Sequence, residues 1–126
     1  MTDTFRRLLR PLAPGSLAEL RRWARAWMAS RHSLVDAGDV VLAMTELVGN
    51  SVQHGSGPVE VELSASGGKL LLQVSDGSDG LPAQRRGELT AESGRGIVLV
   101  ERLAARWGVS LKDGGGKTVW CEFASR

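Results

Sequence analysis

Cysteine and long apolar runs are scarce in this 126-residue sequence, and each shortage excludes a class of protein. Cys121 is the only cysteine, so the chain has no disulfide framework and no cysteine-based zinc site, which fits a reducing cytoplasm. No stretch is long enough to span a membrane, and the N-terminal residues do not resemble a signal peptide. The length predicts a single domain over residues 1–126 with a real hydrophobic core.

The net charge of +2 is small, but it is unevenly distributed. Arginines crowd the first quarter of the chain, where Asp3 and Glu19 are the opposing acids. A nucleic-acid surface is one interpretation. The other is a solvated helix face together with the outer side of a first strand. We favour the second, because we expect no exposed aromatic residues interleaved with the arginines and find no nucleic-acid motif. The arginines are Arg6, Arg7, Arg10, Arg21, Arg22, Arg25 and Arg31.

Proline, glycine and capping residues divide the first half of the chain into a strand and two helices. Prolines 11 and 14 end the strand, and glycines follow the second helix. The predicted elements are an edge strand over Thr4–Arg10, a helix opened by Ser16 with Glu19 as a capping box and ending near Ser30 to Ser33, and a helix from the N-cap Asp36 to about His54.

The second half predicts hairpins around one further helix. Gly67-Gly68 is a hairpin turn signal, and the polar stretch Gly77–Ser93 is long enough to be a functional or disordered loop. The elements are strands Val59–Leu63 and Leu70–Asp76, a helix from Ile97 to about Arg106, and strands Val109–Lys112 and Thr118–Ala124. Together they predict a two-layer α+β sandwich, with a mixed, mostly antiparallel sheet and helices on one face.

One polar stripe stands out inside the second helix. Glu46, Asn50 and His54 are spaced four residues apart, so they lie near one helix face. A carboxylate, an amide and an imidazole in a row are the groups needed to hold a metal-phosphate ligand and move a proton. The intervening apolar residues are expected to supply the core face: Leu47, Val48 and Val52.

Two other polar signals lie at the ends of predicted elements. Asp76-Gly-Ser-Asp-Gly80 follows a strand, and Gly94-Arg95-Gly96 opens a helix. A helix N-terminus with glycines exposes backbone N–H groups to a phosphate. Each signal alone is weak, because Asp-Gly is usually a turn and a lone Gly-x-Gly is common. Their order and joint presence are much more specific.

MTELVGNSVQHG, VSDGSDGLP and ESGRGIVLVERLA resemble the N box and the two glycine boxes of the histidine-kinase-like ATPase superfamily, the Bergerat fold shared with gyrase. The resemblance is strongest to small bacterial ATP-binding domains related to the anti-sigma-factor serine/threonine kinases. It covers roughly residues 17–123. Ser78 departs from the pattern, because a glycine often stands there in the wider superfamily.

The resemblance implies that the protein binds ATP and Mg²⁺. Asn50 would hold Mg²⁺ through its side-chain oxygen, the type of ligand that this cation prefers. Glu46 would be the general base that takes the proton from an attacking hydroxyl. Gly94 and Gly96 would cradle the phosphates, and Arg95 would either touch a phosphate or face solvent. His54 lines the phosphates or only caps the helix end. Two lid arginines would reach the γ-phosphate or face solvent: Arg85 and Arg86.

The resemblance also implies an adenine site. Asp76 would accept a hydrogen bond from the amino group of the base, and a buried acceptor without such a partner would be costly. Gly80 would let the base lie against the backbone. The Thr118 hydroxyl would complete the site. In each case the alternative is an ordinary turn or strand residue.

Two functions from different classes follow. The first is an anti-sigma-factor-type serine/threonine kinase in the cytoplasm that phosphorylates a small antagonist protein, with a sigma factor as a possible second partner and a homodimeric state. The second is a nucleotide-gated binding module of the anti-sigma type without kinase activity. Membrane association is not expected, and a nucleic-acid partner is the weakest alternative.

Overall fold

The computed structural model describes residues 3–9, 15–31, 35–54, 57–77 and 98–124. The predicted lid, about residues 81–93, and the first part of the second glycine box, residues 92–97, fall outside these ranges. The described elements are strands β1 (Asp3–Leu9), β2 (Val59–Ser66), β3 (Lys69–Asp76), β4 (Arg106–Leu111) and β5 (Lys117–Ala124), and helices α1 (Ser16–Ser30) and α2 (Ala37–His54). A shorter helical segment covers 98–103.

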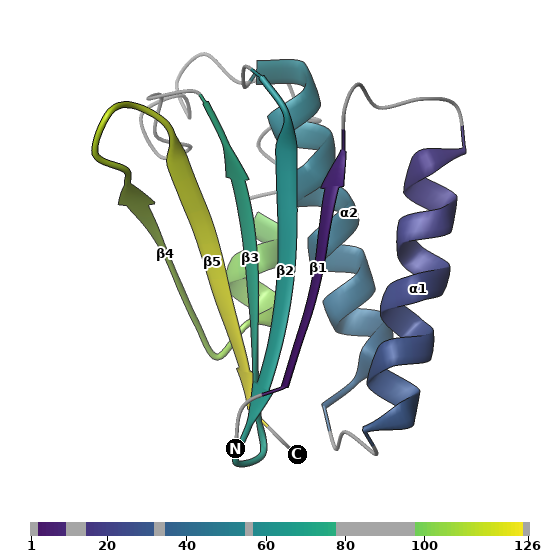
Figure 1. The fold of residues 1–126 in the computed structure, drawn as a ribbon. Coiled ribbons are helices and arrows are strands. Elements are labelled where there is room, and N and C mark those ends of the chain that lie inside the picture. Colours follow the sequence, from purple (N-terminus) through teal and green to yellow (C-terminus); the bar gives the residue numbers. More distant parts are fainter. Residues whose placement is uncertain (1–2, 10–14, 32–34, 55–56, 78–97, 125–126) are drawn as a thin grey trace.

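The five strands form one sheet in the order β1-β2-β3-β5-β4. All four neighbouring pairs are antiparallel, which confirms the expected mostly antiparallel sheet. β3 and β4 run in the same direction, but β5 lies between them and pairs with both (Figure 1). The glycines at 67 and 68 both have positive φ, as the tight turn between β2 and β3 requires.

The helices cover one face of the sheet (Figure 1), so the molecule has the two layers that the sequence predicts. α2 contacts β2 and β3, while α1 packs on α2 and β1. Alternation along β2 and β3 turns every second residue toward the helices. The centre of the core is fully buried: Leu20, Met44, Val48, Val61, Leu63, Leu72 and Val74.

The two helix starts differ in how they are capped. Asp36 caps α2 as predicted, because its Oδ1 accepts the Asp39 backbone N–H at 3.1 Å. The capping box predicted for Ser16 and Glu19 is wrong. The N-cap of α1 is Gly15, which makes no side-chain cap bond, and its carbonyl accepts the Glu19 N–H at 3.0 Å. Gly15 has φ 87°, a left-handed conformation that favours glycine over serine.

The helix predicted to run to Arg106 ends earlier. Helical residues reach 103, and Arg106 is the first residue of β4. The Ala105 N–H already donates to the Glu122 carbonyl of β5 at 2.8 Å. The local pattern of residues 104–106 also suits the end of a helix, but pairing with β5 places Arg106 in a strand instead.

Several of the N-terminal arginines have partners within the protein. Arg6 forms an exposed ion pair with Glu62 on β2, at 3.2 Å. The Arg7 guanidinium lies over the rings of Phe5 and Trp23, 4.7 Å from each centroid. These contacts agree with the interpretation of the cluster as a strand face and a solvated helix face.

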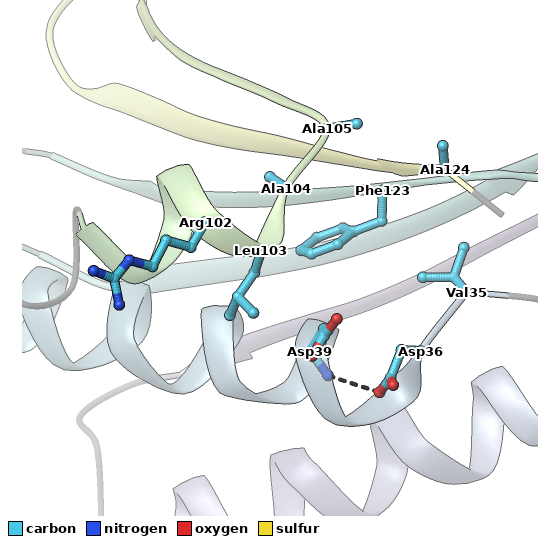
Figure 2. A pocket seen from close by; sticks show the side chains of 9 residues that line it. All are labelled: Val35, Asp36, Asp39, Arg102, Leu103, Ala104, Ala105, Phe123 and Ala124. Carbon is cyan, nitrogen blue, oxygen red and sulfur yellow. Dashed lines mark hydrogen bonds between the residues drawn. The ribbon is translucent and has the colours of Figure 1, made fainter. Parts of the chain in front are cut away.

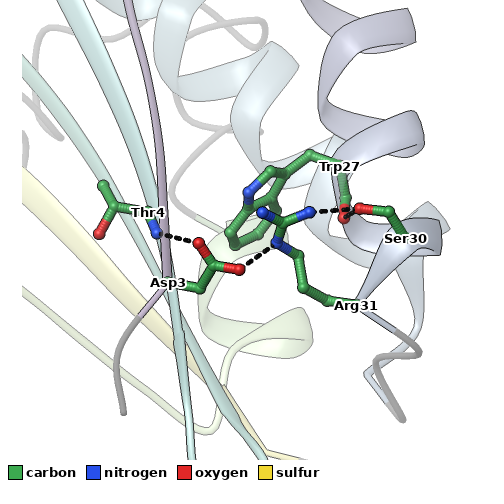
Figure 3. Close-up of polar contacts among 5 residues, drawn as sticks. All are labelled: Asp3, Thr4, Trp27, Ser30 and Arg31. Carbon is green, nitrogen blue, oxygen red and sulfur yellow. Dashed lines mark hydrogen bonds and ion pairs between the residues drawn. The ribbon is translucent and has the colours of Figure 1, made fainter.

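Arg31 joins the end of α1 to the start of β1 (Figure 3). Its Nε contacts the Asp3 carboxylate, its guanidinium lies over the Trp27 ring, and the Ser30 hydroxyl accepts from it. The hydrogen bond from Arg31 lowers the pKa of Asp3. This exposed contact therefore stabilises the fold above the usual carboxyl pKa, and its contribution is lost as the pH falls through the lowered value.

No helix within the described ranges is both long and apolar enough to cross a bilayer.

Cys121 lies in the core on β5, and burial raises the pKa of its thiol to about 12. We expect the folded protein to resist labelling by Ellman's reagent at pH 8, because the thiolate is the reactive species. In denaturing urea one thiol per chain should react. Rapid stoichiometric labelling of the native protein would contradict the buried placement.

Candidate functional site at one end of the sandwich

The polar stripe of α2 lies beside the buried stripe of the same helix. Glu46 and Asn50 are both partly exposed, while Leu47 and Val48 are buried as predicted. Val52 is 48% exposed, so its predicted place in the core is wrong. Ser51 takes the inward position of that turn instead. At about 100° per residue, Asn50 and Val52 fall on opposite flanks of the buried stripe.

Gly49, which precedes Asn50, has free space around it. A Cβ at this position would meet no heavy atom of the described residues within 4 Å. Close packing among those residues therefore does not explain the glycine.

We expect Gly49→Ala to raise the free energy of unfolding by about 1 kcal/mol, since glycine in a helix interior costs that much against alanine. Urea denaturation followed by circular dichroism measures the change. A loss of stability would show that the helix backbone at this position is constrained by something other than propensity.

Asp76 is the last residue of β3, and it is buried with 5% exposure. The register of the sheet places Ser75 opposite Thr118 and Asp76 opposite Lys117 on β5. The hydroxyls of Ser75 and Thr118 are 2.8 Å apart and hydrogen bonded. The predicted adenine-site residues Asp76 and Thr118 thus lie on adjacent strands, at the same end of the sheet.

The Asp76 carboxylate is ion-paired to a lysine of the same chain. Lys117 Nζ donates to both Oδ1 and Oδ2 at 3.2 Å, and the lysine and aspartate side chains are only 6% and 1% exposed. Sequence reasoning missed Lys117, because a lysine after a glycine-rich turn is normally solvated. One signal was available in the sequence. Lys117 immediately precedes Thr118, a predicted site residue, on a strand expected to lie near the strand that ends at Asp76.

Backbone packing brings the β4–β5 turn close to Asp76. A Cβ on Gly116 would lie 2.8 Å from the Asp76 carbonyl oxygen, and Gly116 has φ 101°. Both facts require glycine at this position. The approach holds Lys117, the next residue, against the end of β3.

The ends of three elements meet at this end of the molecule (Figure 1): the C-terminal turn of α2, the end of β3 and the start of β5. Asn50 lies about one turn before the end of α2, and Glu46 lies one further turn back, near the middle of the helix. Four other predicted site residues lie outside the described residues, and so do the lid arginines Arg85 and Arg86. The four are Gly80, Gly94, Arg95 and Gly96.

The described residues suit a purine nucleotide in part. The end of the sheet offers a buried carboxylate and an ammonium group on the face that packs on the helices, which are an acceptor and a donor for the edge of a base. Alternation along β3 and β5 turns the Ser75–Thr118 hydroxyl pair toward the other face. The described residues contain no cluster of three or more His, Cys, Asp or Glu that could hold a metal by itself. Asn50 is one residue that could offer a side-chain oxygen to Mg²⁺, which commonly takes phosphate oxygens and water as its other ligands.

A separate pocket of about 370 Å³ lies at the opposite end of α2 (Figure 2). Asp36 and Asp39 line one side, and Arg102, Leu103 and Phe123 line the others. Asp36 and Asn50 are 14 positions apart in sequence, which corresponds to about 20 Å along a helix axis. This pocket is therefore distinct from the candidate site.

Comparison with known proteins identifies the family and the fold. Residues 11–123 match the family model of the histidine kinase-like ATPase domain. No curated protein matches the sequence. A solved structure, the RsbU and RsbW domains of Rv1364c from Mycobacterium tuberculosis, is similar with a TM-score of 0.69 and 20% sequence identity. The match covers 95% of this chain but only 32% of that one. With the family match spanning nearly all of its sequence, the chain belongs to the histidine kinase-like ATPase domain family.

Proposed function

We propose that this protein binds ATP with Mg²⁺ and acts as an anti-sigma-factor-type serine/threonine kinase on a small antagonist protein. The observation that carries the nucleotide site is the buried Asp76 at the end of β3, where its carboxylate is paired with Lys117. Family membership supports nucleotide binding. The likeness to a structure that contains an RsbW domain supports the kinase type only as an analogy of fold.

In this proposal each site residue has one role. Asp76 holds the base, and Asn50 holds Mg²⁺. The phosphates lie against Gly94 and Gly96, with Arg95 beside them and Gly80 on the base side. Bound Mg²⁺ would neutralise phosphate charge during transfer.

Glu46 lies one helical turn before Asn50 on the partly exposed flank of α2. It takes the proton from a serine or threonine hydroxyl of the partner. The hydroxyl oxygen bonds to the γ-phosphorus, the bond from phosphorus to the β,γ-bridging oxygen breaks, and ADP leaves. Most of the rate enhancement would come from positioning and charge neutralisation.

The partners are also proposals. A small antagonist protein is the phosphate acceptor, a sigma factor is the second partner, and the protein works in the cytoplasm as a homodimer. β1 is an edge strand of the sheet, so it offers one surface for self-association. Light scattering after gel filtration would measure the mass in solution.

The test combines binding and transfer. Calorimetry with ATP should show binding that Mg²⁺ strengthens, and Asn50→Ala should abolish the Mg²⁺ enhancement while the fold is retained. Incubation with co-purified partner proteins, followed by mass spectrometry, should then reveal a phosphoserine or phosphothreonine. ATP binding without transfer to any partner would select the binding module. Absence of ATP binding would overturn the proposal.

A further inference from the structure

The Lys117 ammonium is an unusual group to find buried beside a base-binding carboxylate. It carries three N–H donors and no acceptor. Asp76 Oδ1 and Oδ2 take two of these donors at 3.2 Å. No residue in the described part of the chain accepts the third, although the Lys117 side chain is only 6% exposed. A donor is therefore left over at the end of the sheet where the base would bind.

Stability alone does not explain the pair. Withdrawing both charges from water is costly, and apolar residues of similar volume often serve a core equally well or better. The pair stands at the end of the sheet face that packs on the helices. A carboxylate and an ammonium therefore take the place of apolar side chains on a face whose next inward layer is the buried Val74 and Val119.

We propose that Lys117 is a base-recognition residue of the nucleotide site. This inference rests on the proposed nucleotide binding and extends it to a residue that sequence reasoning missed. The third N–H of Lys117 donates to the ring nitrogen next to the amino group of an adenine base. Asp76 accepts from that amino group while it stays paired with Lys117.

The chemistry of the carboxylate allows both contacts. A carboxylate has about four acceptor positions on its two oxygens, so pairing with Lys117 does not use all of them. An adenine presents an amino donor directly beside a ring-nitrogen acceptor, which matches an acceptor beside a donor on the protein. The ion pair would hold both partners in place before the base arrives, which reduces the ordering cost of binding.

The experiment measures ADP analogues by calorimetry against the intact protein. 1-Deaza-ADP replaces the ring nitrogen beside the amino group with C–H, so it removes the proposed acceptor. We expect it to bind about 10–100-fold more weakly than ADP, as fits one hydrogen bond from a charged donor. 3-Deaza-ADP, which alters the other side of the ring, is the ligand control and should lose much less.

Protein variants assign the effect to Lys117. In Lys117→Met the penalty for 1-deaza-ADP should fall below about threefold, whereas the exposed Lys112→Met on the same hairpin should keep the full penalty. Equal affinity of ADP and 1-deaza-ADP for the wild type, or an unchanged penalty in Lys117→Met, would overturn the inference. Failure of ADP itself to bind would instead overturn the proposed function.

A measurement on the wild type covers the case in which Lys117→Met does not fold. The side-chain ¹⁵N resonance of a buried ammonium is observable by NMR, and Lys117→Arg assigns it by its disappearance. ADP should shift this resonance, and saturating 1-deaza-ADP should shift it much less. A resonance that responds equally to both ligands would show that Lys117 only supports Asp76.

Discussion

Replacing Asp76 with alanine should lower the free energy of unfolding by about 3–5 kcal/mol, because the change leaves the buried Lys117 ammonium without its counter-charge. Lys117 Nζ contacts both carboxylate oxygens, and both side chains are almost inaccessible to water. Urea denaturation measures the loss as a lower midpoint at similar slope. Nucleotide binding should be lost as well, since the amino group of the base loses its acceptor.

The double variant Asp76→Leu/Lys117→Met separates the two effects. It removes both charges together and puts apolar groups in their place, so most of the stability should return while nucleotide binding stays absent. Asp113→Ala, at an exposed turn position of the neighbouring hairpin, is the matched control and should change stability by less than about 0.5 kcal/mol. A loss below about 1 kcal/mol in Asp76→Ala would contradict the buried pair.

Glu46→Gln should reduce phosphotransfer to the partner protein about 10²–10⁴-fold, which is the usual contribution of a general base. The amide keeps the shape of the carboxylate but cannot take the proton. Since the side chain is partly exposed, the fold and the affinity for ADP should change little. Transfer is measured with radiolabelled ATP, and ADP affinity by calorimetry.

Glu19→Gln is the control for that experiment. Glu19 is exposed in the first turn of α1, and its replacement should leave transfer unchanged. Full activity in Glu46→Gln would remove Glu46 from the base role while leaving the nucleotide site intact.

Periodicity and capping residues predict most of the fold. Asp36 caps α2 as its place in the sequence indicates, and alternation along β2 and β3 indicates correctly which face of each strand is buried. Capping residues and apolar alternation depend only on neighbouring positions, so they can be recognised in the sequence alone. The same periodicity places Glu46 and Asn50 on one flank of α2, where the structure has them.

The remaining features depend on contacts between distant residues. Lys117 is buried because the register between β3 and β5 places it opposite Asp76. The residues around Lys117 do not by themselves predict that register. Val52 fits the apolar pattern of α2, but it lies on the flank away from the buried stripe. Arg106 joins β4 because β5 supplies its pairing partner.

The order of the strands also bears on how the protein folds. β5 comes last in the sequence but lies inside the sheet, where it pairs with β3 and β4. Lys117 and Asp76 are 41 positions apart, so their contact can form only after a long segment of chain has been closed into a loop. A nascent chain that has completed β3 therefore carries an unpaired sheet edge and a solvated Asp76 until β5 is made. Docking of that one strand closes the sheet and completes the charge pair in a single event.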